Sequence, residues 1–256
     1  MDSLNLRFMW GLWDKGDIPH KIKERHIFME KKFSCKISVH GKDDIENLVK
    51  KYTQEFDSDF SKLYYNIQRK VARADLGRYL LIFYMGGIYL DNDAIIKNIN
   101  PYRNLSSYKN GIWEIEKIVN INQLGPLEKP ISKRIANYII ATPPQSMILL
   151  EILKESSYRV KSRLEKGGEW NDSDILWATG PDVVTTIIDK WNTQSDILIC
   201  KGNVEHFSEG TWRNGQDKTE FANLVFKKYT WDNYYITFLE GNKMDAFGVE
   251  IGRAHV

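Results

Sequence analysis

The sequence predicts a single-domain protein of the α/β class. Three observations lead to this prediction. Short β-prone segments alternate with helical segments along the chain, no internal repeat or low-complexity region interrupts them, and no linker-like stretch divides the 256 residues. We therefore expect one domain over residues 1–256, with residues 245–256 as a candidate tail.

The composition excludes several classes of protein. The chain has 36 basic and 34 acidic residues, a net charge of +2, which argues against a nucleic-acid partner. Two cysteines are too few for a disulfide framework. The N-terminus lacks the pattern of a signal peptide, and no stretch approaches the roughly 18 apolar residues that span a bilayer. These features predict a cytoplasmic protein without a transmembrane segment; they leave the oligomeric state undetermined.

The first forty residues contain two predicted strands. Residues 6–10 (LRFMW) form a short β-prone opening, and residues 17–19 are a turn signal. A charged helix is expected over residues 20–32. Residues 33–40 alternate apolar and polar side chains, which is typical of a half-buried strand. Residues 43–51 follow as a helix.

A long helix is predicted over residues 66–85, ended by Gly86-Gly87. Its apolar side chains recur at helical spacing and form one stripe. Asp75 and Arg78 lie three residues apart at the edge of this stripe, so we expect them at the border between core and solvent. The stripe consists of Ala72, Leu76, Tyr79, Leu80 and Phe83.

Two carboxylates follow the next predicted strand, residues 88–90. A period of two would place Tyr89, Asp91 and Asp93 on one face if the strand continued. A buried strand that ends in two carboxylates on one side is costly unless a cation neutralises them. The sequence therefore predicts a cation-binding site here.

The second half of the chain continues the alternation of strands and helices. Residues 132–142 are compatible with either type of element, and residues 206–212 are expected in a loop. Predicted strands are residues 111–121, 197–200 and 221–229, and predicted helices are residues 146–166 and 181–191.

The segment from Arg73 to Asp93 carries a family resemblance. An Asp-Leu-x-Arg-Tyr-Leu helix precedes Gly-Gly-Ile-Tyr-Leu-Asp-x-Asp, and this combination resembles the DxD-containing sugar transferases of glycosyltransferase family 32, the capsular-polysaccharide and mannosyltransferase-like group. The glucosylating domains of large clostridial toxins share that core. The resemblance is strongest over residues 69–101.

Weaker matches follow in the order that the family has them. They are Met9-Trp10 with Ile18-Pro19, Ile135-Ala136-Asn137, Thr179-Gly180-Pro181, and His206 with Thr211-Trp212. The resemblance implies a GT-A fold, a nucleotide-binding Rossmann-like sandwich around a mainly parallel sheet, with the acidic pair at the carboxyl end of a central strand. It also implies a metal-dependent, retaining hexosyltransferase of polysaccharide biosynthesis, which moves a sugar from a UDP- or GDP-sugar to a glycan or lipid-linked acceptor.

The resemblance also implies roles for individual residues. Asp93 would ligate Mn²⁺ or Mg²⁺, and Asp91 would contact ribose and sugar hydroxyls or a metal-bound water. Asp75 and Arg78 match the sugar-contacting pair. The predicted catalytic residues are Asp75, Arg78, Asp91 and Asn137; the donor-binding residues are Trp10, Asp75, Arg78, Tyr89, Asp91, Asn92, Thr211 and Trp212; the metal ligands are Asp93, Asp91 and His206.

Each of these assignments has a plainer alternative. The acidic pair is also compatible with a solvated turn or a structural calcium loop, and Asp75–Arg78 with a surface salt bridge. His206 is equally compatible with an unligated loop histidine, and Trp10 and Trp212 with packed aromatics. Asn137 is also compatible with a helix-surface residue, and Tyr89 with a core residue. At the level of function, the alternatives are a toxin-like enzyme that glycosylates a protein, acting in a host cytosol, and a non-catalytic nucleotide-sugar-binding module.

Overall fold

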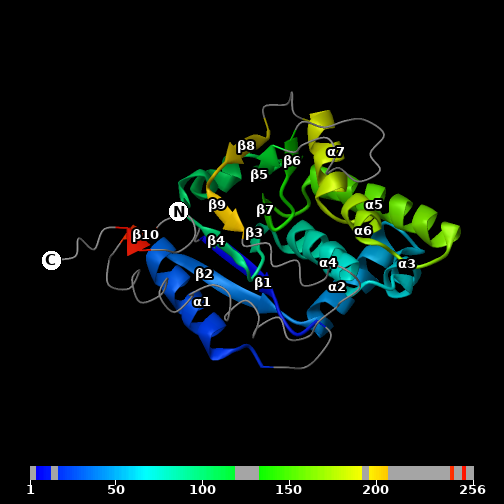
Figure 1. Cartoon of the computed structure of the whole chain (residues 1–256), viewed down its shortest axis with the longest axis horizontal. Coiled ribbons are helices and arrows are strands. Elements are labelled where there is room, and N and C mark those ends of the chain that lie inside the picture. Colours follow the sequence, from blue (N-terminus) through cyan, green and yellow to red (C-terminus); the bar gives the residue numbers. More distant parts are fainter. Residues whose placement is uncertain are drawn as a thin grey trace.

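A seven-stranded mixed sheet forms the centre of the protein (Figure 1). The computed structural model describes residues 4–12, 17–118, 133–191, 196–206, 243–244 and 250–251. The strand order is β2-β1-β3-β7-β5-β6, and β8 pairs with β5. The strands are β1 (Leu4–Met9), β2 (Cys35–His40), β3 (Gly87–Leu90), β5 (Ile112–Ile118), β6 (Lys133–Ile135), β7 (Ile139–Thr142) and β8 (Leu198–Lys201).

Most strands of this sheet run in one direction. β1 is parallel to both β2 and β3, and β5 is parallel to β8, whereas β6 and β7 run antiparallel to their neighbours. The α/β class and the mainly parallel central sheet that the sequence predicts are therefore confirmed. A short antiparallel pair, β4 (Ala94–Ile96) with β9 (Val204–His206), lies beside the main sheet, and β10 (Lys243–Met244) pairs with β11 (Glu250–Ile251).

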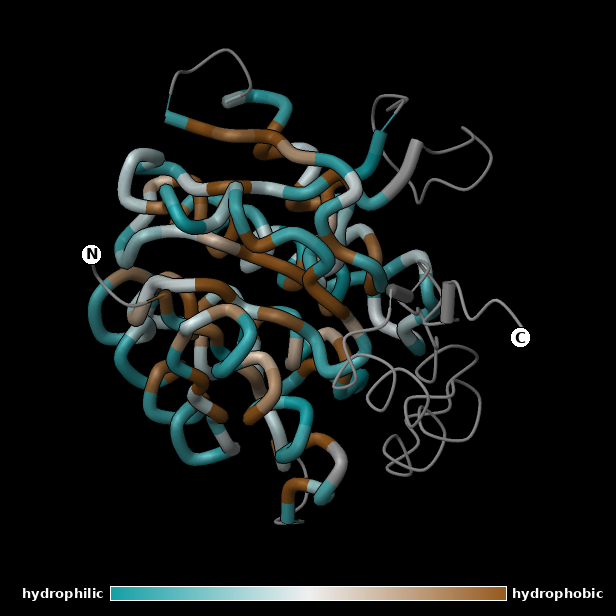
Figure 2. The backbone as a smooth tube through the Cα atoms, turned by 90° about the vertical axis from the view of Figure 1, so that its left-hand side faces the viewer, coloured by the Kyte–Doolittle hydropathy of each residue, from teal (hydrophilic) through white to brown (hydrophobic). Residues whose placement is uncertain are grey.

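Helices cover the two faces of the sheet with separate apolar cores. One face packs against α1 and the 3-10 helix η1, and the other packs against the group of helices on the right of Figure 1. Figure 2 shows hydrophobic segments running through the interior of the molecule. The helices are α1 (His20–Phe33), α2 (Lys42–Glu55), α3 (Phe60–Asn66), α4 (Lys70–Met85), η1 (Asn100–Ser107), α5 (Met147–Lys166), α6 (Asp172–Ala178) and α7 (Pro181–Trp191).

Several predicted boundaries differ from the observed elements. The long helix begins at Lys70 and not at residue 66, because α3 ends at Asn66 and Ile67 and Arg69 have extended backbone angles. Residues 132–142 form two strands, β6 and β7, and α6 is a helix that the sequence did not indicate. His206 ends strand β9 rather than lying in a loop. The predicted strand at residues 221–229 lies outside the described residues.

The central helix α4 is buried on nearly all sides. Its predicted stripe lies in the core, and so do Asp75 and Arg78, which are only 3% and 6% exposed. They are therefore not at the border with solvent, because α2, α5, β3 and β7 all pack around this helix. Among the described residues, no helix is both long and apolar enough to cross a membrane.

Gly86 ends α4 in a conformation that favours glycine strongly. Its φ and ψ are 60° and −172°, and a Cβ placed there would lie 2.5 Å from Cδ of Pro144. Gly167 ends α5 with almost the same angles, 66° and −174°, but a Cβ there would have no atom within 4 Å. An alanine at either position would have a strained backbone, but only an alanine at Gly86 would also overlap with a neighbouring residue.

We expect Gly86→Ala to destabilise the protein more than Gly167→Ala. Backbone strain should lower the free energy of unfolding of both variants by about 1–3 kcal/mol. Gly86→Ala should lower it by about 1–3 kcal/mol more, because Pro144 must move. Urea unfolding followed by circular dichroism measures the free energy of unfolding. Equal losses in the two variants would contradict the tight contact between Gly86 and Pro144.

Candidate functional site

The acidic pair lies in a turn at the carboxyl end of β3. Strand β3 ends at Leu90, so Asp91 and Asp93 do not share a strand face as a continued strand would require. The turn is held by backbone bonds instead: Asp91 N–H donates to the carbonyl of Tyr138 (2.8 Å), and Ala94 N–H donates to the carbonyl of Asp91 (3.0 Å). This is the edge of an α/β sheet at which ligands usually bind.

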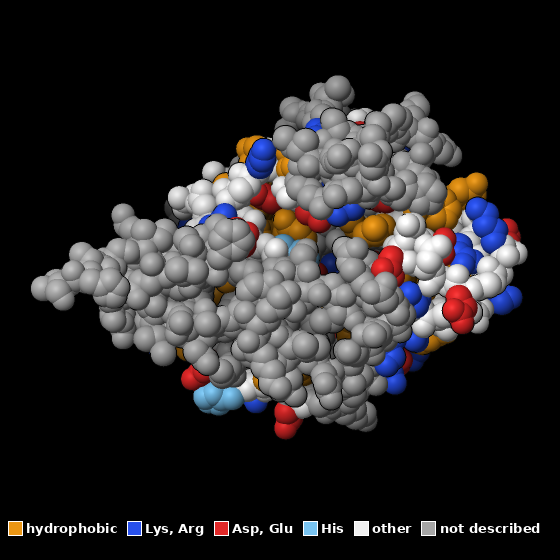
Figure 3. Space-filling view, in the orientation of Figure 1, with side chains coloured by type: hydrophobic (Ala, Val, Ile, Leu, Met, Phe, Trp, Pro, Cys, Tyr) orange, Lys and Arg blue, Asp and Glu red, His pale blue; other side chains and the backbone are white. Residues whose placement is uncertain are grey.

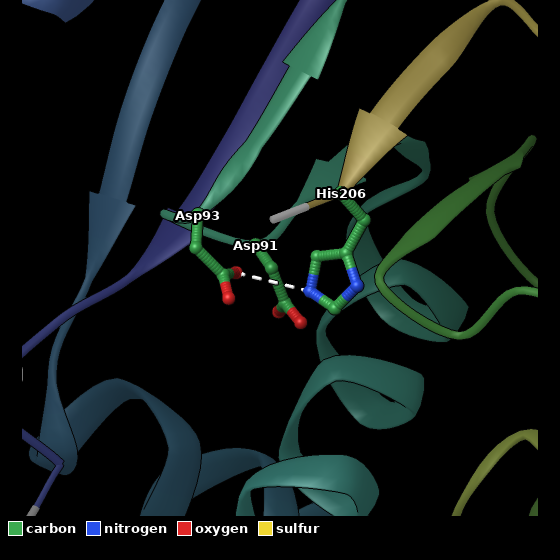
Figure 4. Close-up of side chains that lie close together, drawn as sticks. All are labelled: Asp91, Asp93 and His206. Carbon is green, nitrogen blue, oxygen red and sulfur yellow. Dashed lines mark hydrogen bonds and ion pairs between the residues drawn. The ribbon is translucent and has the colours of Figure 1, made fainter. Parts of the chain in front are cut away.

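His206 meets the two carboxylates from a distant part of the chain. Its Nε2 lies 3.2 Å from Oδ1 of Asp93, and one ligand atom from each of Asp91, Asp93 and His206 lies within 4.8 Å of the others (Figure 4). The β4–β9 pair brings them together, because its register places His206 opposite Ala94. The imidazole also stacks on the ring of Tyr138, with centroids 4.1 Å apart.

Asp91 is engaged by protein donors on both carboxylate oxygens. Tyr89 donates its hydroxyl hydrogen to Oδ1, and Arg78 donates to Oδ2 at 3.1 Å. Arg78 also lies over the ring of Tyr89, 5.2 Å from its centroid. Asp93 is therefore the carboxylate better placed for direct binding of a cation, while Asp91 is held in place by its neighbours.

A second cluster of polar side chains surrounds Asp75 in the interior of the protein. Arg78 Nη2 lies 3.1 Å from one Asp75 oxygen, and the Asn137 amide donates to the same oxygen at 3.0 Å. Thr179 donates its hydroxyl hydrogen to the other oxygen at 2.9 Å. Arg78 donates as well to the carbonyl of Asn137 (2.9 Å). The structure thus brings together residues from α4, the β6–β7 connection and the turn before α7.

Burial and neighbouring charges perturb the pKa values of these groups in opposite directions. Burial raises the pKa of Asp75 to about 7, although Arg78 and Thr179 oppose the change. Burial also raises the pKa of Asp91, against the effect of Arg78. At Asp93 burial opposes ionisation, but His206 outweighs it and the pKa falls. Burial favours neutral His206, yet Asp93 and Asp91 together raise its pKa.

The other predicted site residues are placed less decisively. Trp10 follows β1, is partly exposed and donates its backbone N–H to the carbonyl of His40 (3.1 Å). The Asn92 side chain donates to the carbonyl of Met9 (2.9 Å), and Tyr89 is buried behind Asp91. Thr211 and Trp212 lie outside the described residues.

In the view of Figure 3, acidic, basic, histidine and hydrophobic side chains meet near the centre of the face.

Three residues near the cluster were missed by reasoning from the sequence. Tyr138 stacks on His206, and Arg25 of α1 donates to the backbone of the acidic turn. Buried Glu114 accepts the backbone N–H of Asn203 (2.7 Å), and thereby holds the turn that leads into β9. Only Tyr138 carried a sequence signal, its position next to Asn137; Arg25 and Glu114 stand far from any motif.

A divalent cation fits the ligand set of this cluster. Two carboxylates and an imidazole suit an ion of the Mn²⁺ or Mg²⁺ type. Metal–ligand bonds of about 2.0–2.1 Å in octahedral geometry place adjacent ligand atoms about 3 Å apart. The 3.2 Å between Asp93 Oδ1 and His206 Nε2 agrees with that spacing. Asp93 and His206 would hold the ion directly.

A known family matches the part of the chain that carries the acidic pair. The model of the family described as a glycosyltransferase sugar-binding region containing a DXD motif matches residues 19–110. This range contains Asp75, Arg78, Asp91 and Asp93, but not Asn137 or His206. No curated protein matches the chain.

Solved structures of toxin domains are similar to the chain at low identity. The PaToxG glycosyltransferase is 19% identical, with a TM-score of 0.44, over 74% of this chain and 69% of that one. The UDP-bound glycosyltransferase domain of the YGT toxin is 10% identical, with a TM-score of 0.40, over 72% and 56%. The catalytic domain of α-toxin from Clostridium novyi is 13% identical, with a TM-score of 0.39, over 73% and 72%.

The Asp93–His206 pair predicts a pH-dependent stability of the metal-free protein. Because the folded-state pKa of His206 lies above its unfolded value of about 6.5, the pair stabilises the protein fully below that pH. This contribution is lost as the pH rises through the folded pKa. In EDTA, we expect the free energy of unfolding to fall more between pH 6 and pH 8.5 in the native protein than in His206→Gln.

Urea unfolding at the two pH values checks this expectation. Asp75 also ionises in this range, but it does so in both proteins, so its effect cancels in the comparison. An identical pH dependence in the two proteins would rule out a charged His206–Asp93 pair.

Proposed function

We propose that this protein is a metal-dependent glycosyltransferase that moves a sugar from a nucleotide-sugar donor to a glycan or lipid-linked acceptor. The observation that carries the proposal is the combination of two adjacent polar groups at one edge of the sheet. One group, Asp91, Asp93 and His206, fits a divalent cation. The other, Asp75 and Arg78, offers buried charged groups beside it, and Arg78 contacts both groups.

In this proposal Asp93 and His206 would hold Mn²⁺ or Mg²⁺, and the bound ion would supply positive charge for the diphosphate of the leaving group. Asp91 contributes to the same site through its position between Arg78 and Asp93. Its carboxylate accepts from Arg78 and Tyr89 and is therefore oriented before any ligand binds. Pre-oriented charges stabilise a developing negative charge without reorganisation at the moment of reaction.

Asp75, Arg78 and Asn137 are proposed to hold the donor sugar. Ionised Asp75 would accept hydrogen bonds from sugar hydroxyls, and Asn137 and Thr179 keep its carboxylate oriented. Nε of Arg78 is buried and has no hydrogen-bond partner among the described residues. A buried N–H group without an acceptor is costly, so this group suits an oxygen atom of a bound nucleotide sugar.

The remaining predicted contacts complete the proposal. Trp10 would stack on the nucleobase, Asn92 and Tyr89 would line the donor site, and Thr211 and Trp212 would cover the diphosphate and exclude water. The transfer is proposed to retain the anomeric configuration and to move a hexosyl group. Identification of the product anomer by NMR would test this last point.

A thermal-shift screen tests the proposed function. Nucleoside diphosphates and UDP- and GDP-sugars are each added with and without Mn²⁺, and a donor that raises the melting temperature only with the metal identifies the base. Labelled donor is then incubated with carbohydrate and protein acceptors. The proposal is wrong if no donor binds or is hydrolysed in the presence of Mn²⁺. If the label is found on protein alone, the acceptor is a protein and not a glycan.

Asp93→Asn should abolish the metal-dependent shift and lower the transfer rate about 10²–10³-fold, the usual loss for one electrostatic contact to a leaving group. Asp44→Asn is the control, because it removes one negative charge at the exposed start of α2. Initial rates and melting temperatures of both variants check the expectation. Full activity of Asp93→Asn, or an equal loss in both variants, would contradict a role for Asp93 in metal binding.

Thr179→Val should move the pH dependence of transfer to higher pH. The Thr179 hydroxyl stabilises ionised Asp75, whose pKa is about 7, so its removal raises that pKa further. If donor binding needs ionised Asp75, kcat/KM rises with pH near 7, and the midpoint shifts upward in the variant. Thr186→Val, which removes a hydroxyl donating within α7, should leave the midpoint unchanged. An unchanged midpoint in Thr179→Val would show that ionisation of Asp75 does not cause the pH dependence of kcat/KM.

A further inference from the structure

Arg25 reaches from α1 to the backbone of the acidic turn. It is buried, 5% exposed, and its two terminal nitrogens donate to the carbonyls of Asn92 and Ala94. The guanidinium carbon lies 5.8 Å from the centroid of the Phe8 ring, on strand β1. One side chain therefore ties α1, β1 and the turn together.

The two carbonyls that Arg25 binds are those on either side of Asp93. The Asn92 carbonyl belongs to the peptide unit that joins Asn92 to Asp93, and the Ala94 carbonyl belongs to the unit that joins Ala94 to Ile95. One planar fork therefore holds the backbone before and after Asp93. A guanidinium can satisfy two such acceptors at once, whereas the single nitrogen of lysine has no matching fork. Through these backbone contacts Arg25 restricts the directions open to the Asp93 side chain.

The contact with Ala94 lies at the first residue of strand β4. Ala94 donates its N–H to the carbonyl of Asp91 and accepts from Arg25 at its own carbonyl. Ala94 is also the residue that lies opposite His206 in the β4–β9 pair. Arg25 therefore binds the backbone of the residue that pairs with His206.

We propose that Arg25 is a positioning residue for the metal site, and that its fork on the Asn92 and Ala94 carbonyls sets the geometry of Asp93 and His206. This inference rests on the proposed function, because it takes the three-residue cluster to be a metal site. It concerns binding of the metal alone and can be tested without a donor or an acceptor.

The chain offers a matched control for Arg25. Arg163 of α5 donates to the carbonyls of Gly167 (2.6 Å) and Glu169, again two residues apart, and lies 5.7 Å from the centroid of the Trp170 ring. It is 8% exposed and additionally pairs with Asp174 at 2.9 Å. It has the same type of fork and similar burial, but no contact with the cluster.

The experiment measures Mn²⁺ affinity by EPR titration of EDTA-treated protein, for the native chain and for Arg25→Lys, Arg163→Lys and Asp93→Asn. Arg25→Lys keeps the charge and loses the fork, so we expect a 10–100-fold weaker affinity, as is usual for residues that orient metal ligands. The EPR spectrum of its bound Mn²⁺ should also change. Arg163→Lys should bind Mn²⁺ like the native protein, even if its melting temperature falls.

The outcomes separate the inference from the proposed function. Native binding that is lost in Asp93→Asn but unchanged in Arg25→Lys overturns the role of Arg25 and leaves the metal site intact. Equal weakening in Arg25→Lys and Arg163→Lys also overturns it, because the effect is then general destabilisation. Failure of the native protein to bind Mn²⁺, or unchanged binding in Asp93→Asn, overturns the metal site itself. If Arg25→Lys does not fold, Arg25→Gln takes its place under the same criteria.

Discussion

The contact on which the rest of the site depends is the buried guanidinium of Arg78. It lies between Asp75 and Asp91, at 3.1 Å from each, and donates to the carbonyl of Asn137. Burial of such a group is costly, and an ion pair of this type is weak evidence for stability. Loss of Arg78 would nevertheless leave buried Asp75 and half-buried Asp91 without the cation that they share. The position of α4 beside β3 and β7 is therefore tied to this one side chain.

Charge balance links this contact to the cluster at the end of β3. Asp75, Asp91 and Asp93 carry three negative charges when ionised, and Arg78 and Arg25 provide two positive ones. Protonated His206 supplies the third, and the neighbouring carboxylates of Asp93 and Asp91 raise the pKa of His206. A divalent cation bound to His206 would take the place of this proton, because only the neutral imidazole is a ligand. The exchange would leave one surplus positive charge, which would suit an anionic ligand such as a diphosphate.

The sequence predicted the elements of this site better than their surroundings. The α4 stripe, the glycine stop, strand β3 and the acidic pair were all recognisable, because local spacing determines them. The burial of Asp75 and Arg78 was not, because a helical wheel describes one stripe and contains no information about α2, α5 and β7 packing on the other sides. The two-strand form of residues 132–142 was equally inaccessible, because apolar runs of that length suit either element.

The residues that set fine geometry are the hardest to predict from sequence. Asp93 and His206 are 113 positions apart, and their contact depends on the register of β4 with β9. That register is held at one end by Arg25 on Ala94 and at the other by Glu114 on Asn203, which lies next to β9. Neither anchor has a motif, since each acts on backbone atoms that every residue type possesses. Side chains that bind backbone leave no pairwise sequence pattern, so only the assembled fold reveals their part in the site.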